Sequence, residues 1–321
     1  MDAAAAGAQN RFGISLTEKD ITRILKRYDV GSFSGIDRVM DRKQARAPLS
    51  YVISTGTGRY YLKQYRKRGF TEKALLLVEF LRGKGYPCVE IIRSNDGELD
   101  VVSKGKRFSL FRLLEGHTIN RLTYRNAYQL GKYLGRLHVT AINFKMEKAY
   151  VTYNYFRGLF LKNCRKRMPA RVRKGMEFMR ENLDAMRFPE RLPKSICHEE
   201  FTNEHVLFRN GKVVGVIDWD IAGPNHMFYD LGSSMYSAFY YDKGFHLSFS
   251  ALKGIIAGYS SERKLTDWER GHLYEALLFG VFKNSMWHIN CREVDWNAGD
   301  IRILAEMAKY KKGDFSILEQ L

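Results

Sequence analysis

The sequence predicts an α+β protein in which a small lobe built on an antiparallel sheet precedes a larger, mostly helical lobe. Between Gly31 and Lys106, short runs suited to strands alternate with Gly, Asn and Asp turn residues, a pattern typical of hairpins. After Gly116, apolar residues recur at helical spacing instead. The length of 321 residues is enough for two lobes with a sizeable core.

The first lobe is predicted to begin with a helix and to continue with strands. Thr17 is expected to cap this helix, because apolar residues follow it at helical spacing. Residues 51–54 and 60–65 flank a Thr-Gly-Thr-Gly turn and predict a hairpin. The other predicted elements of this lobe are a helix over 71–84 and strands over 89–92, 99–103 and 107–113.

The second lobe is predicted to be helical on both sides of one loop and hairpin. Its first helix presents an apolar face formed by Ala127, Leu130, Leu134 and Leu137. Gly131 and Gly135 lie on the same helix and allow a neighbour to pack closely. The helical pattern resumes over 155–186 and again over most of 231–321.

The net charge of +18 favours an anionic partner, such as a nucleotide phosphate or an acidic surface. A generally basic, solvated surface accounts for the charge equally well. Nucleic acid is the weaker alternative, because no nucleic-acid-binding motif accompanies the charge.

The four cysteines are widely spaced without a CxxC pair, so we expect reduced thiols rather than disulfides or a metal site. The first residues lack the basic and apolar segments of a signal peptide. No run approaches the roughly 18 apolar residues of a membrane span. We therefore expect a cytoplasmic protein without membrane contact.

One loop and the hairpin after it carry the chemistry. The loop reads His-Glu-Glu-Phe-Thr-Asn-Glu-His from His198 to His205, and the second strand of the hairpin, over 213–220, ends in Asp-Trp-Asp. A base followed by a carboxylate-tipped hairpin is the layout of phosphoryl transfer: the acceptor hydroxyl needs a carboxylate, and the cation on ATP needs oxygen ligands. Asp218, at the end of an apolar strand, would be costly unless it is paired or binds a cation.

This stretch resembles the aminoglycoside phosphotransferase, choline kinase and homoserine kinase superfamily, whose members share the protein-kinase fold. The usual loop is His-Gly-Asp-x-x-x-x-Asn, and the usual hairpin ends in Ile-Asp-x-Asp or Ile-Asp-Trp-Asp. The hairpin matches well, but Glu199 replaces the Gly, Glu200 the catalytic Asp and His205 the metal-binding Asn. The chain is most similar to the spore coat CotS-like branch, and the likeness spans most of its length.

The resemblance implies a two-lobed protein-kinase-like fold and a role for four residues. Glu200 would accept the proton of the acceptor, while Asp218 and His205 would hold the metal ion. Lys63 lies in a Tyr-x-Leu-Lys-type strand and would contact the α and β phosphates of ATP.

The segment 108–116 resembles the strand and hinge that join the two lobes. We therefore place the lobes over 14–113 and 114–321. The hinge backbone at Leu113 and Leu114 would offer hydrogen bonds to adenine.

The glutamate that orients Lys63 is less well defined by the sequence. Counting forward from Lys63 suggests Glu79, which we favour, whereas counting back from the end of the helix reaches Ala74. Glu72 shares a helix face with Glu79. As an alternative, both glutamates are ordinary surface residues.

Two basic segments are candidates for anion contacts. Residues 40–48 join two strands without the glycines of a phosphate-covering loop, but Arg42, Lys43 and Arg46 offer charge. The run over 165–167 is a candidate for holding an anionic acceptor. Solvated basic surfaces are the alternative for both segments.

Two residues near the loop are expected to be structural. His198 would brace the loop through backbone hydrogen bonds, and Asp230 would cap the helix that follows.

We predict an ATP- and Mg-dependent phosphotransferase, with Mn as the alternative ion, acting on a hydroxyl of a small molecule. Glu200 and His205 predict slow or specialised activity. The rival hypothesis is a catalytically degenerate, kinase-like structural or binding protein, with the spore coat as its location.

Overall fold

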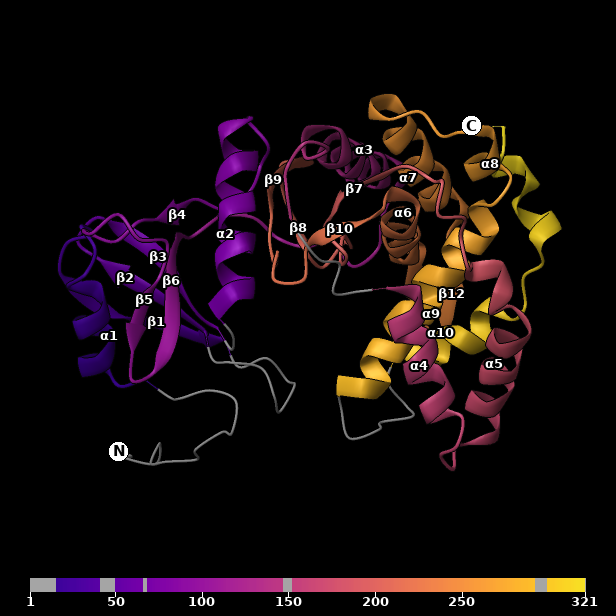
Figure 1. The fold of residues 1–321 in the computed structure, drawn as a ribbon, viewed down its shortest axis with the longest axis horizontal. Coiled ribbons are helices and arrows are strands. Elements are labelled where there is room, and N and C mark those ends of the chain that lie inside the picture. Colours follow the sequence, from indigo (N-terminus) through magenta and orange to yellow (C-terminus); the bar gives the residue numbers. More distant parts are fainter. Residues whose placement is uncertain (1–15, 41–49, 66–67, 147–151, 292–298, 321) are drawn as a thin grey trace. The chain divides into compact units, whose positions relative to one another are not determined.

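The structure is a computed structural model, and it describes residues 16–40, 50–65, 68–146, 152–291 and 299–320. The chain divides into two compact units after Leu114 (Figure 1). This division lies one residue from the boundary expected between 113 and 114.

The first unit is an antiparallel sheet with two helices. Its helices are α1 (Glu18–Leu25) and α2 (Arg68–Gly83). Its strands are β1 (Phe33–Met40), β2 (Ser50–Thr55), β3 (Gly58–Tyr65), β4 (Ile91–Ile92), β5 (Val101–Ser103) and β6 (Lys106–Arg112). The strand order is β1-β2-β3-β6-β4, and β5 also pairs with β6.

The core of the first unit forms between α1 and the sheet. Thr17 caps α1 as predicted: its side chain accepts a hydrogen bond from the backbone N–H of Asp20, and the Asp20 carboxylate accepts one from the backbone N–H of Thr17. The buried face of the helix carries Ile24, which belongs to one apolar cluster with Tyr51 and Phe108 of the sheet. Cap and core together fix α1 on the strands.

The predicted hairpin is present as β2 and β3, and β3 is an interior strand. Lys63 pairs with Ser50 of β2 on one side and with Ser109 of β6 on the other. Since both edges of β3 are hydrogen-bonded, the backbone that carries Lys63 is held firmly.

The second unit is mostly helical. Its helices are α3 (Tyr124–Thr140), α4 (Tyr153–Asn163), α5 (Ala170–Glu181), α6 (Met227–Met235), α7 (Phe249–Glu262), α8 (Asp267–Arg270), α9 (Leu273–Cys291) and α10 (Gly299–Met307), with 3₁₀ turns η1 (Asp184–Met186), η2 (Tyr236–Ala238) and η3 (Lys312–Leu318). Its strands are β7 (Lys194–Cys197), β8 (Val206–Arg209), β9 (Lys212–Val216), β10 (Gly223–His226), β11 (Phe239–Tyr241) and β12 (Phe245–Leu247). They pair as β7 with β10, β8 with β9 and β11 with β12.

The β11–β12 hairpin interrupts the helical pattern that the sequence suggested after residue 231. Aromatic residues fill this hairpin, and Tyr241 packs against Phe245 across it. Cross-strand aromatic pairs stabilise a sheet, so they outweigh the surrounding helical preference here. None of the helices in the described residues combines the length and apolar character that a membrane crossing requires.

The close packing predicted at Gly131 and Gly135 is present, and the neighbour that packs there is α7. A Cβ atom at Gly131 would overlap the carbonyl oxygen of Ile255. A Cβ atom at Gly135 would lie 2.8 Å from the carbonyl oxygen of Tyr259. Only glycine lets the two helix backbones approach this closely. Of these two helices, α3 also packs against β7, which leads into the loop at His198.

Replacing Gly131 with Ala should destabilise the protein by about 1–3 kcal/mol, because the added methyl group must force α3 away from α7. The matched control is Gly158→Ala on α4, where nothing lies within 4 Å of the new Cβ atom. That control should stabilise the helix by up to about 1 kcal/mol. Chemical denaturation measures both changes, and equal effects would contradict the tight α3–α7 contact.

Candidate functional site

The loop from His198 to His205 lies between β7 and the β8–β9 hairpin, and Asp218 follows that hairpin. The predicted strand over 213–220 is too long, because β9 ends at Val216. Asp218 has a φ of 67°, a left-handed conformation that ends the extended ladder. Aspartate tolerates this conformation better than most residues do.

Three predicted site residues converge. One ligand atom each from Glu200, His205 and Asp218 lies within 4.8 Å of the other two. His205 Nε2 is 3.7 Å from Asp218 Oδ2, and the Asp218 side chain is only 6% exposed. The loop and the hairpin therefore bring two carboxylates and one imidazole to a single point.

The backbone fixes the orientation of His205. Its Nδ1 lies 2.7 Å from the carbonyl oxygen of Glu200. A carbonyl oxygen only accepts hydrogen bonds, so Nδ1 carries a proton. In the neutral ring Nε2 then keeps its lone pair, and this atom is the one that faces Asp218.

The donor set fits a divalent cation. A carboxylate oxygen of Asp218 and the Nε2 lone pair of His205 are ordinary metal ligands, and their separation of 3.7 Å allows one ion to contact both, with the Glu200 carboxylate close by. The hydrogen bond from Nδ1 to a backbone carbonyl is the arrangement that orients a metal-binding histidine.

His198 braces the loop, as the sequence predicted. Its Nε2 donates to the carbonyl oxygen of Ile217 at 2.9 Å, and its Nδ1 accepts from the backbone N–H of Glu200 at 3.2 Å. Burial lowers the pKa of His198 to about 4, so the ring is neutral near pH 7. The ring is buried and neutral, and both of its nitrogens form hydrogen bonds. It therefore links the segment that carries Glu200 to the segment that carries Asp218.

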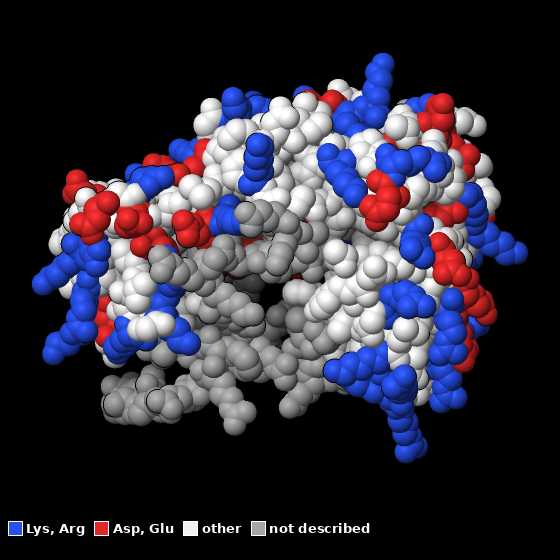
Figure 2. Space-filling model, in the orientation of Figure 1, with Lys and Arg blue, Asp and Glu red and all other residues white. Residues whose placement is uncertain are grey.

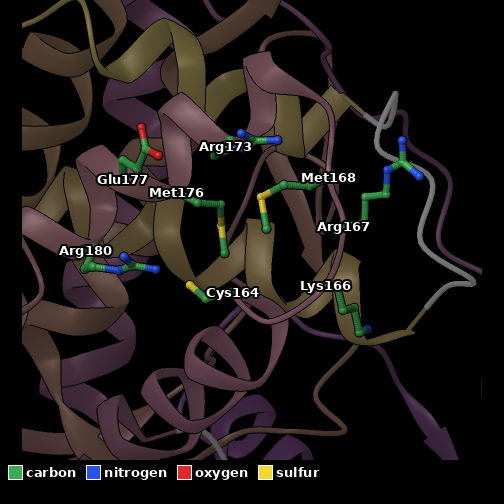
Figure 3. Close-up of a pocket in the computed structure, with 8 residues that line it drawn as sticks. All are labelled: Cys164, Lys166, Arg167, Met168, Arg173, Met176, Glu177 and Arg180. Carbon is green, nitrogen blue, oxygen red and sulfur yellow. The ribbon is translucent and has the colours of Figure 1, made fainter.

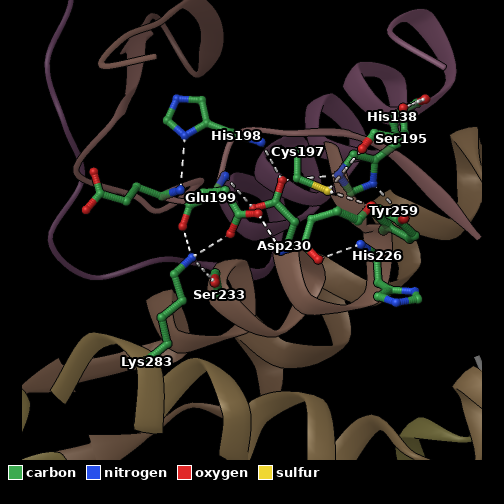
Figure 4. A network of polar contacts seen from close by, with 12 residues as sticks. His138, Ser195, Cys197, His198, Glu199, His226, Asp230, Ser233, Tyr259 and Lys283 are labelled. Atoms are coloured by element: carbon green, nitrogen blue, oxygen red, sulfur yellow. Dashed lines mark hydrogen bonds and ion pairs between the residues drawn. The ribbon is translucent and has the colours of Figure 1, made fainter. Parts of the chain in front are cut away.

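Asp230 does not cap the helix, and that expectation was wrong. It lies inside α6, whose N-cap is His226, and its carboxylate accepts the backbone N–H groups of His198 (2.8 Å) and Glu199 (3.0 Å). His138 Nε2 lies 3.1 Å from the same carboxylate (Figure 4). Asp230 is fully buried, so its charge anchors the start of the loop to α6 and α3.

Burial would raise the pKa of Asp230, but the hydrogen bond from His138 and the nearby Lys283 charge hold that pKa below its ordinary value. The aspartate is therefore ionised under physiological conditions. An ionised acceptor makes stronger hydrogen bonds to the two loop N–H groups than a neutral one would.

Lys283 is a residue of this site that reasoning from sequence missed. It lies on α9, is 3% exposed and contacts Glu199 (Figure 4). A signal was present: Lys283 follows the run Ala276–Phe282, which is apolar throughout, and a charge within such a helix needs a buried partner. Its partner could not be named, because it lies 84 residues away.

In the first unit, Glu79 does not pair with Lys63, which corrects the pairing that we favoured. Arg93 holds Glu79 through two bonds, from Nε to Oε1 at 2.9 Å and from Nη2 to Oε2 at 2.5 Å. A guanidinium presents two parallel N–H donors that match both carboxylate oxygens, a geometry that an ammonium lacks. Lys63 Nζ instead lies 5.3 Å from the centre of the Tyr65 ring.

The hinge residues follow β6, and one of their expected hydrogen-bond groups is already used. The N–H of Leu113 donates to the carbonyl oxygen of Arg59 at 3.0 Å. Among the described residues, no backbone hydrogen bond is formed by the N–H of Leu114. Adenine binding at these residues stays a prediction, and it would have to use the carbonyl of Leu113 and the N–H of Leu114.

The two basic segments have different outcomes. Arg42, Lys43 and Arg46 lie outside the described residues. The run over 165–167 lies beyond the end of α4, where Lys and Arg predominate at the surface (Figure 2), and is not part of the Glu200 cluster.

Residues of this run border a cavity of about 260 Å³ between the end of α4 and α5 (Figure 3). Its lining combines Cys164, Met168 and Met176 with four cationic side chains and one carboxylate, those of Lys166, Arg167, Arg173, Arg180 and Glu177. An anionic partner at this place stays a prediction, separate from the chemistry at Glu200.

Comparison with known proteins gives a consistent likeness. The family model described as "Phosphotransferase enzyme family" (APH) matches residues 43–274. Homoserine kinase of Mesorhizobium japonicum (strain LMG 29417 / CECT 9101 / MAFF 303099) is 27% identical, over 80% of this chain and 81% of its own. Homoserine kinase of Phenylobacterium zucineum (strain HLK1) is 25% identical, over 85% and 86% respectively.

Solved structures share the fold. Amicoumacin kinase hAmiN, solved with AMP-PNP, Ca²⁺ and Ami, superposes with a TM-score of 0.65 at 14% identity, covering 93% of this chain and 94% of its own. An aminoglycoside phosphotransferase from Alicyclobacillus acidocaldarius gives a TM-score of 0.66 at 14% identity, covering 96% of each chain. The predicted two-lobed, kinase-like α+β fold is thus confirmed.

Proposed function

Since the chain belongs to the phosphotransferase enzyme family (APH), we propose that it transfers the γ-phosphoryl group of ATP to a hydroxyl group of a small molecule. In this reaction the acceptor oxygen forms a bond to phosphorus, the bond to the β-γ bridging oxygen breaks, and ADP leaves. The acceptor hydroxyl loses its proton to a base on the enzyme.

The observation that carries this proposal is the convergence of Glu200, His205 and Asp218 on a braced loop. Phosphoryl transfer depends on positioning and electrostatics more than on covalent chemistry. A rigid loop that carries the base Glu200 and the cation ligand His205, with the second cation ligand Asp218 beside it, supplies both. His198 and Asp230 give that rigidity, because they hold the backbone on either side of Glu199.

We assign the roles as follows. Glu200 accepts the proton of the acceptor, and Asp218 and His205 hold a divalent cation. When bound, that cation would neutralise charge on the β and γ phosphates. Lys63 binds the α and β phosphates, and the backbone at Leu113 and Leu114 binds adenine.

The imidazole changes the preferred ion. Mg²⁺ favours oxygen ligands and ordered water, whereas nitrogen ligands suit softer ions such as Mn²⁺. With His205 Nε2 facing Asp218 in place of an amide oxygen, we propose that Mn²⁺ supports the reaction better than Mg²⁺.

The first acceptor to test is homoserine, because the homoserine kinases align over most of this chain and of their own length. Other amino alcohols, sugars and aminoglycosides form the comparison set. A second candidate function is a degenerate, kinase-like binding protein, and the substitutions at 200 and 205 favour it.

Restoring the usual residues separates the two functions. If the site is adapted to Glu and His, Glu200→Asp combined with His205→Asn should lower Mn²⁺-dependent turnover by about 100-fold, because the carboxylate moves by about 1 Å. Initial rates of ADP formation measure this change. A rate that rises in the double variant would support the degenerate site instead.

A further inference from the structure

Glu199 is held in a conformation that a glutamate avoids. Its φ is 71°, in the left-handed region, and its side chain is 1% exposed. Such a conformation costs a residue with a Cβ atom on the order of 1 kcal/mol or more, whereas glycine adopts it freely. It persists only when surrounding contacts hold it in place.

Those contacts come from three elements. The Glu199 carboxylate accepts from Asn225 Nδ2 of β10 at 2.7 Å and lies 3.3 Å from Lys283 Nζ of α9. Lys283 Nζ also donates to Ser233 Oγ of α6 at 2.9 Å. The Lys283 side chain is only 4% exposed, so these partners replace the water molecules that would otherwise solvate its ammonium group.

The same lysine holds the peptide group that joins Glu199 to Glu200. Lys283 Nζ donates to the carbonyl oxygen of Glu199, and the N–H of the same peptide donates to His198 Nδ1 (Figure 4). Both polar atoms of this one peptide are therefore bonded to buried side chains. A rotation of the peptide plane would break both bonds.

We propose that Lys283 and Glu199 are positioning residues that lock this peptide plane and thereby set the position of the Glu200 carboxylate. The inference rests on the proposed role of Glu200. Without the ammonium, Glu199 would relax toward negative φ, and the peptide that leads into Glu200 would turn with it. The lock matters because an error of about 1 Å at a catalytic group costs roughly 100-fold in rate.

The decisive variant is Lys283→Met, which keeps the apolar stem and removes the ammonium. We expect kcat to fall by about 100-fold with KM for ATP unchanged, because the nucleotide contacts are not altered. Adding Glu199→Gly should restore most of the rate, since glycine adopts the positive φ without help and leaves no buried carboxylate. Lys253→Met, on α7, is the control and should keep the normal rate.

Amide hydrogen exchange at Glu200 reports the peptide plane without turnover. Its N–H should be protected in the unmutated protein and in Lys253→Met, exposed in Lys283→Met, and protected again in the double variant. If the unmutated protein has no turnover, the proposed function fails, but this exchange pattern still tests the lock.

Two results would overturn the proposal. One is a Lys283→Met protein that keeps both the Glu200 protection and the kcat per folded molecule. The other is failure of both Lys283→Met and the double variant to fold, which would make Lys283 a purely structural residue.

Discussion

Replacing Glu200 with Gln should reduce turnover by about 100-fold to 10,000-fold, the usual contribution of a general base. An amide has nearly the shape of the carboxylate but does not accept a proton at neutral pH. The backbone of Glu200 keeps its bonds, because its carbonyl still accepts from Thr202 N–H and from His205 Nδ1. Nucleotide affinity should therefore stay unchanged, as measured by calorimetry beside the rate of ADP formation.

The matched control is Glu204→Gln on the same loop, because Glu204 is exposed and lies outside the cluster of Glu200, His205 and Asp218. This variant should keep the normal rate. Equal turnover in Glu200→Gln and the unmutated protein would remove Glu200 from the chemistry.

Replacing Asp218 with Ala should abolish the part of ATP binding that depends on a divalent cation. The Asp218 side chain is 6% exposed and faces His205 Nε2. A water molecule in place of the carboxylate would bind the cation less strongly. Calorimetric titration with ATP, in the presence and absence of Mn²⁺, measures the loss. The residual affinity should equal that of the unmutated protein in a chelator.

Asp242→Ala is the control for this second experiment, because Asp242 is exposed on the β11–β12 hairpin. Cation-dependent binding that survives in Asp218→Ala would mean that the cation is held elsewhere.

The elements with local signals were predictable from the sequence. Thr17 caps its helix through residues three positions away, and the Thr-Gly-Thr-Gly turn joins the two strands that flank it. The close helix packing at Gly131 was also predictable, because small residues on an apolar helix face indicate close packing. Each of these features depends on a few neighbours in the chain.

Partner choices across the fold were not predictable. Glu79 lies on the expected helix but binds Arg93, whose guanidinium offers two parallel donors. The sequence around Asp230 suggested a helix cap, but the residue is buried inside the helix. Its oxygens accept hydrogen bonds from N–H groups of the loop. Both outcomes depend on which charged groups the fold brings together. A single sequence does not reveal the distances between residues that lie far apart in the chain.

The candidate site was predictable in its residues but not in its geometry. The loop motif gave Glu200, His205 and Asp218, and the resemblance supplied their expected roles. Their convergence, and the proton on His205 Nδ1, follow from the three-dimensional positions alone. The contribution of Lys283 required the fold of α9 against the loop.

The most direct test of the central claim is product formation by the unmutated protein. The protein is incubated with ATP and either Mn²⁺ or Mg²⁺, together with homoserine, other amino alcohols, sugars or aminoglycosides, and phosphorylated products are identified by mass spectrometry. The proposed function predicts a phosphate monoester of at least one acceptor, formed faster with Mn²⁺ and lost in Glu200→Gln. Absence of any phosphorylated acceptor with either ion would contradict it.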